Sequence, residues 1–214
     1  VAGALVVLGI GVQLLGVLLY PAMENTDLGR ALFGAFGVLV LALALWVVNR
    51  SPSINWIAWC LAIPAVLLSL LSIGMQHPGL LVYAHLLEGA LYFYTAASLT
   101  AYMLQDHKVT SDELFAAGAT FTLLAWAFAF SFSVCQEWYP GSFIAAVDPE
   151  AQRTWMELLY LSFSTVSGVG LSDIIPIKPH ARALVMLAQF AGVMYIAVVV
   201  SRLIGLTVRV SPRT

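Results

Sequence analysis

The sequence predicts an all-α membrane protein with six membrane-spanning helices and one short helix that enters the membrane without crossing it. The first observation is composition, since 61% of the 214 residues are hydrophobic and only 9% are charged, whereas charged residues make up about a quarter of soluble domains. The second is a set of long apolar runs near the roughly 20 residues that a spanning helix needs. The third is an apolar stretch, Trp155 to Ser164, that is too short to cross.

The six predicted spans are separated by polar residues, prolines and glycines. They are Val1 to Tyr20, Ala31 to Val48, Trp56 to Ile73, Leu80 to Leu104, Ser111 to Trp138, and Pro179 to about Val208. Pro21 and the polar MENTD stretch at residues 23–27 are expected to end the first span, and the segment from Asn49 to Pro52 to end the second.

Capping and turn signals set the ends of the last two spans. Thr110 and Glu113 have the S/T-x-x-E spacing of a capping box, which predicts a helix start near Ser111. The sequence Tyr-Pro-Gly-Ser at residues 139–142 predicts a turn after the fifth span. Pro179 suits the first position of the sixth helix, because its missing N–H has no partner there in any case.

Charge and composition exclude several classes of function. The net charge is −2 and no basic stripe is present, so nucleic-acid binding is not expected. Cys60 and Cys135 lie in separate apolar segments without further ligands at metal spacing, so both are expected to be buried thiols. No Ser/His/Asp or metal constellation converges at one membrane depth, so we expect neither an enzyme nor a cofactor. The expected partners are lipid and other membrane subunits.

The stretch LYLSFSTVSGVGLSDIIP, from Leu159 to Pro176, places a short amphipathic helix, a glycine-containing turn and Asp173 directly before the sixth span. It resembles the pore loop of the potassium-channel superfamily, whose usual pattern runs close to LYFSFVTLTTVGYGDIVP. The positions that carry the same residue are Leu159, Tyr160, Ser162, Phe163, Thr165, Val169, Gly170, Asp173, Ile174 and Pro176. The family's filter TVGYGD then corresponds to GVGLSD in this chain.

The resemblance covers Leu114 to about Leu206 and implies a prokaryotic tetrameric cation channel. Residues 111–214 would form the pore domain and residues 1–110 a four-helix domain. The family's arrangement implies a homotetramer in the cell (inner) membrane, multi-pass, with both termini cytoplasmic. A cytosolic regulatory domain is a further partner that would lie outside this chain.

The resemblance also assigns roles to residues of the loop. The conduction filter would be Gly168, Val169, Gly170, Leu171 and Ser172, supported by Thr165, Ser167 and Asp173, with K⁺ or Na⁺ held transiently at the filter carbonyls. Gly168 lacks the family's threonine hydroxyl, Leu171 lacks its aromatic brace, and Ser172 replaces a glycine. These departures imply reduced or altered potassium selectivity. Asp173 is expected to tie the filter mouth to the pore helix.

The four-helix domain resembles a voltage sensor by position only. Voltage-gated relatives place Arg or Lys at every third residue of the fourth span, whereas Leu80 to Leu104 contains neither. Since one charge crossing the field contributes about 2.3 kcal/mol per 100 mV, such a span has almost no sensitivity to voltage. His85 and Glu88 share one helical face there and are expected to form a satisfied structural pair, with functional coupling as the alternative.

Two interpretations stay open from sequence alone. Gly192 lies where related channels carry a gating hinge in the inner helix, but a small residue in a membrane helix equally allows close packing. A non-conducting membrane sensor or scaffold that retains the pore architecture is the alternative to a channel. Glu157, at the start of the short helix, is expected to be a helix cap rather than an ion site.

Overall fold

The computed structural model describes residues 2–23, 55–75, 77, 79–105 and 111–210. They form helices joined by short connections and one small sheet. The predicted second span, Ala31 to Val48, lies outside the described residues, as does Thr110 of the predicted capping box.

The described helices follow the apolar runs of the sequence closely. They are α1 (Ala2–Met23), α3 (Asn55–Met75), α4 (Gly79–Gln105), α5 (Ser111–Trp138), the short α6 (Trp155–Val166) and α7 (Pro179–Val210). The predicted bounds of the third to sixth spans agree with α3, α4, α5 and α7 to within two residues. Apolar length and turn chemistry therefore determined these elements.

Pro21 does not end the first helix, which corrects the prediction. Helix α1 continues through it to Met23. A proline in the last turn removes a single backbone donor, and helices in apolar surroundings tolerate this because local adjustments satisfy the freed groups. Pro64 likewise lies inside α3.

The all-α fold class needs one correction. Strands β1 (Phe143–Ala145) and β2 (Ile174–Pro176) form a two-stranded antiparallel sheet, with Phe143 opposite Pro176 and Ala145 opposite Ile174. Phe143, Ala145 and Ile174 are buried, so this ladder satisfies backbone groups that would otherwise be buried unpaired. The sheet joins the loop after α5 to the chain that follows the predicted filter.

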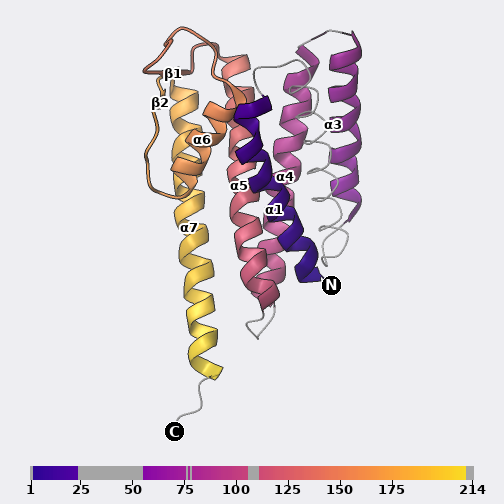
Figure 1. Ribbon diagram of the computed structural model, residues 1–214, viewed down its shortest axis with the longest axis vertical. Helices are drawn as coiled ribbons and strands as arrows, with labels where there is room; N and C mark the ends of the chain where they lie inside the picture. Colours follow the sequence, from indigo (N-terminus) through magenta and orange to yellow (C-terminus); the bar gives the residue numbers. More distant parts are fainter. Residues whose placement is uncertain (1, 24–54, 76, 78, 106–110, 211–214) are drawn as a thin grey trace.

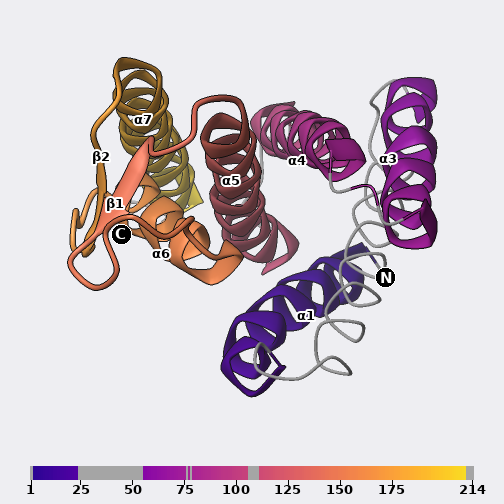
Figure 2. The same ribbon diagram turned by 90° about the horizontal axis from the view of Figure 1, so that it is seen from above.

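Helix α5 is the central element of the fold. It packs against α1, α4, α6 and α7, whereas α3 packs on α4. Seen from above, α7, α5, α4 and α3 follow one another in a row, and α6 and α1 lie on the same side of it (Figure 2). The small sheet lies at one end of the molecule, beside the top of α7 (Figure 1). Helices α1 and α4 therefore pack directly on α5, whereas α3 reaches it through α4.

Two hydrophobic clusters meet at α5. One lies between α4, α5 and the start of α6 and contains Tyr92, Trp126, Phe130 and Trp155. The other lies between α5, α6, α7 and the sheet and contains buried side chains such as Phe132, Leu158, Ile174 and Ala188. The short helix α6 belongs to both clusters, so it is held on both of its sides.

Two described stretches are long and apolar enough to cross a bilayer, Phe115–Trp138 in α5 and Pro179–Val199 in α7. Gly11–Tyr20 and Trp56–Ser72 are apolar but shorter. Helix α4 has the length of a span, but His85, Glu88 and four tyrosines lower its hydropathy. The six-span count therefore remains a prediction. Cys135 is buried as expected, but Cys60 is exposed on the outer surface of α3, which corrects that prediction.

Candidate functional site

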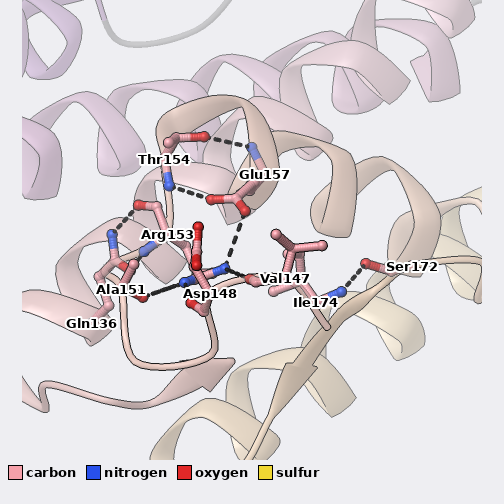
Figure 3. A network of polar contacts seen from close by, with 9 residues as sticks. All are labelled: Gln136, Val147, Asp148, Ala151, Arg153, Thr154, Glu157, Ser172 and Ile174. Atoms are coloured by element: carbon pink, nitrogen blue, oxygen red, sulfur yellow. Dashed lines mark hydrogen bonds and ion pairs between the residues drawn. The ribbon is translucent and has the colours of Figure 1, made fainter. Parts of the chain in front are cut away.

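The short helix α6 begins at a capping box. The backbone N–H of Glu157 donates to Thr154 Oγ1 over 3.3 Å, and the N–H of Thr154 donates to Glu157 Oε2 over 2.6 Å (Figure 3). The capping box thus satisfies two backbone donors at this terminus, and the carboxylate lies at the positive end of the helix dipole. Glu157 is therefore a helix cap, as the sequence predicted.

Arg153 fixes the start of α6 to the loop before it, a role that sequence reasoning missed. Its side chain is 2% exposed and forms an ion pair of 3.2 Å with Glu157. It also donates to the carbonyls of Val147, Asp148 and Ala151 (Figure 3). A buried guanidinium needs this many acceptors because an unpaired buried charge is very costly. The sequence signal that could have predicted this role is an arginine directly before the capping-box residue Thr154.

The end of α5 holds the same turn. Gln136 Nε2 donates to the carbonyl of Arg153 over 2.9 Å, and the N–H of Arg153 donates to Gln136 Oε1 over 3.2 Å. Further along α6, the buried hydroxyl of Ser162 donates to the carbonyl of Ala125 over 2.6 Å. Helix α6 is thus tied to α5 at its first turn and again near its middle.

Thr165 and Ser167, the predicted filter supports, lie at the end of α6. Thr165 is buried, and its hydroxyl donates to the carbonyls of Leu161 and Ser162 within the helix. Ser167 is the C-cap, and its hydroxyl donates to the carbonyl of Ser164 over 3.2 Å. Both side chains therefore stabilise the helix end from which the loop departs.

Gly168 terminates α6 in the left-handed conformation. Its φ is +74°, and its N–H donates to the carbonyl of Thr165 over 3.2 Å. This is the usual geometry of a glycine that closes a helix, because a Cβ is strained at positive φ. Gly170 follows with φ of +72°, and its N–H donates to the carbonyl of Ser164 over 3.0 Å. The loop thus turns back to satisfy the last helix carbonyls.

The other residues of the predicted filter are exposed or partly exposed. Val169 and Leu171 are 72% and 70% exposed. Ser172 does not adopt positive φ, which among described non-glycine residues occurs only at Asp148. Its hydroxyl instead accepts from the N–H of Ile174 over 3.1 Å. The outer turn therefore bends without the left-handed residue that the family's second glycine supplies.

Asp173 is exposed and makes no hydrogen bond or ion pair within the described part of the chain. Its expected tie to the short helix is therefore not formed within the described residues. Among the described residues, no group of three or more His, Cys, Asp or Glu side chains is placed to hold a metal ion.

Gly192 lies where the backbone of α7 passes close to the end of α6. A Cβ built on this glycine would be 1.9 Å from the carbonyl oxygen of Val166. Small residues permit such close backbone approach between membrane helices. The close contact with Val166 therefore supports the packing interpretation of Gly192. Helix α7 is continuous through this position, so the gating hinge remains a prediction.

His85 and Glu88 do not pair with each other but turn to different helices. His85 Nδ1 shares a hydrogen bond of 3.1 Å with Ser133 Oγ on α5. Glu88 Oε1 accepts from Ser69 Oγ on α3 over 3.4 Å. The predicted pairing of these two residues is therefore wrong, and each instead has one hydroxyl partner on a neighbouring helix.

Comparison with known families adds one finding to this geometry. Residues 118–209 match the family model described as "Ion channel". The match covers α5 after its first turns, the capped helix α6, the exposed loop and α7. No curated protein and no solved structure matches the chain significantly. Together with the two membrane-capable helices, the match supports an ion-channel domain in a membrane protein and points to a non-enzymatic function.

Proposed function

We propose, on the premise that residues 118–209 form an ion-channel domain, that this chain is one subunit of a homotetrameric channel for monovalent cations. The observation that supports the proposal most is the capped helix α6, which ends in an exposed loop between two membrane-capable helices. Helix and loop lie inside the matched region. Non-helical backbone at membrane depth is tolerated only where it is buried in protein or lines water.

A tetramer would supply what the single subunit lacks. Helix α7 exposes a continuous apolar surface that includes Met186, Leu187, Phe190, Val193 and Met194. One copy of the helix–loop–helix unit cannot enclose an ion path, whereas four copies around an axis can. Part of the exposed surface of α7 would then line the axis or face the next subunit, and the rest would face lipid.

Cations would pass the backbone carbonyls of Gly168 to Ser172, where K⁺ or Na⁺ would bind transiently. The negative end of the α6 dipole points toward this loop and favours cations there. Because Gly168 caps the helix and carries no hydroxyl, the innermost site would lack side-chain oxygens. The proposed filter therefore discriminates poorly between potassium and sodium.

Gating would not depend on fixed charges in α4, because Leu80 to Leu104 contains no Lys or Arg. We place the channel in the cell membrane with its termini on the cytoplasmic side. In support, the first residues of α1 and the last residues of α7 lie toward the same end of the molecule (Figure 1). No cofactor is required for this mechanism.

Cation flux into liposomes that contain the purified protein tests the proposal. We expect the wild type to carry both potassium and sodium. Gly170→Ala should reduce the flux strongly, because alanine is strained at the φ of +72° found there. Gly79→Ala is the matched control, since nothing lies within 4 Å of that added Cβ. If the well-folded wild type carries neither cation, a sensor or scaffold with a retained pore architecture is the better account.

A further inference from the structure

His85 connects α4 to the helix that carries the loop. Its ring lies 6.1 Å from the ring of Trp155, the first residue of α6, and 5.4 Å from that of Phe130 on α5. Its hydrogen bond to Ser133 holds the imidazole in this orientation. A residue of the domain before the pore thus touches the start of α6 directly, at the end away from the loop.

Trp155 is held by rings rather than by hydrogen bonds. It packs on Phe130 with centroids 4.4 Å apart and on Trp126 at 5.8 Å. The buried indole N–H groups of Trp126 and Trp155 have no hydrogen-bond partner among the described residues. The position of Trp155 therefore depends on the shape of this cluster, to which α4 contributes both His85 and Tyr92.

Helix α6 can transmit a displacement from one of its ends to the other. It has 12 residues and is capped at both ends, and a helix of this length spans about 18 Å. Its C-terminal carbonyls bind the N–H groups of Gly168 and Gly170. A shift of Trp155 would therefore move the hydrogen-bond acceptors on which the loop is built.

A histidine in this place has a cost that a phenylalanine would not have. Ionisable side chains within membrane helices are expensive and commonly mark functional sites. Glu88, one turn along α4, binds α3 instead of the pore domain. Of His85 and Glu88, His85 is therefore the one whose ring packs on the helix that carries the loop.

We infer that His85 is a positioning residue that couples the helices before residue 110 to the conformation of the loop at Gly168 to Ser172, through Trp155 and α6. Any displacement of α4 would then reach the loop directly from the start of α6. The effect on conduction rests on the proposed channel function. The structural coupling itself does not.

Hydrogen exchange of the full chain in lipid nanodiscs measures this coupling without requiring conduction. We expect His85→Ala to speed exchange of the amides at residues 163–172 by roughly 2- to 13-fold, the range that one lost aromatic pair supports. His85→Phe keeps a ring but loses the bond to Ser133 and should give a smaller increase. Tyr83→Leu is the control, because Tyr83 is 55% exposed on the same helix.

A second arm uses Trp155→Leu, alone and combined with His85→Ala. If the two residues act through one contact, their effects on exchange at residues 163–172 will be less than additive. A merely structural role predicts faster exchange around His85 in α4 and α5 with residues 163–172 unchanged, which would overturn the inference. If His85→Ala does not fold, the same criteria apply to His85→Phe.

The outcomes separate this inference from the proposed function. Faster exchange at residues 163–172 in a wild-type background that carries no cation would support the coupling and refute the channel. Normal cation flux with unchanged exchange in both His85 variants would refute the coupling and leave the channel standing. In a conducting protein, the potassium-to-sodium permeability ratio should also change in His85→Ala but not in Tyr83→Leu.

Discussion

Gly168 shows at the scale of a single residue why this chain departs from the potassium-channel pattern. The family places a threonine at this position, whereas here the residue ends α6 at φ of +74°. A β-branched side chain rarely adopts that conformation. The glycine therefore serves helix termination, and the hydroxyl of the family's innermost ion site is lost as a consequence.

Gly168→Thr should destabilise the protein by about 1–2 kcal/mol, because a left-handed conformation costs a non-glycine residue that much. Gly168→Asn should cost less, since asparagine tolerates this conformation better. Thermal unfolding in detergent measures both changes. Gly74→Ala is the control, because its added Cβ meets nothing within 4 Å. Equal melting temperatures for Gly168→Thr and wild type would mean that the cap is not formed as described.

Gly192 is the second residue whose missing side chain is required. Gly192→Ala would place a methyl group against the carbonyl of Val166, so α6 and α7 must separate. We expect a loss of stability of about 1–3 kcal/mol, as for other overpacked sites, and a bias toward one conductance state. Thermal unfolding and single-channel recording test the two effects. A variant with wild-type stability and altered gating would favour the hinge over close packing.

At the scale of elements, specific close contacts join α5, α6 and α7 to one another. Ser162 ties α6 to α5 through the carbonyl of Ala125, and Gly192 lets α7 approach α6. Tyr195 ties α7 to α5, because its hydroxyl donates to the carbonyl of Ala117 over 2.5 Å. Much of the α7 surface around and beyond Tyr195 is exposed, so this bond is important for holding that half of the helix.

Tyr195→Phe removes only the hydroxyl of this contact. Hydrogen bonds between membrane helices contribute about 0.6 kcal/mol on average and up to about 1.7 kcal/mol, so the amides of α7 beyond Tyr195 should exchange roughly 3- to 18-fold faster. Hydrogen-exchange mass spectrometry measures this, with Tyr102→Phe as an exposed control on α4. Unchanged exchange there would show that packing around Val199 holds the helix without the bond.

Element bounds were largely predictable, whereas the contacts that build the site were not. The capping-box spacing of Thr110 and Glu113 and the turn at residues 139–142 predicted the bounds of α5, because both signals are local in sequence. Strands β1 and β2 were missed, since three-residue strands carry too few positions to show alternation. The left-handed conformation of Gly168 was not predicted, because the sequence analysis aligned this glycine with a filter threonine and not with a helix end. Contacts such as His85 with Trp155 join residues far apart in sequence, which no local pattern reveals.

At the scale of the whole molecule, burial is unequal between the two membrane-capable helices. The spanning part of α5 is 67% buried inside the subunit, whereas that of α7 is 22% buried. Helix α5 is therefore central in the described chain, whereas α7 is an outer element with an exposed apolar surface. This inequality fits the proposed tetramer, in which α7 would surround the axis.

Reversal potentials of the purified channel in planar bilayers, with potassium on one side and sodium on the other, test the central claim most directly. A filter with Gly168, Leu171 and Ser172 should carry both cations and exclude chloride, so we expect a cation current that reverses close to zero millivolts. A reversal potential that reports strong preference for potassium would contradict the account of the filter, and the absence of any current would contradict the channel itself.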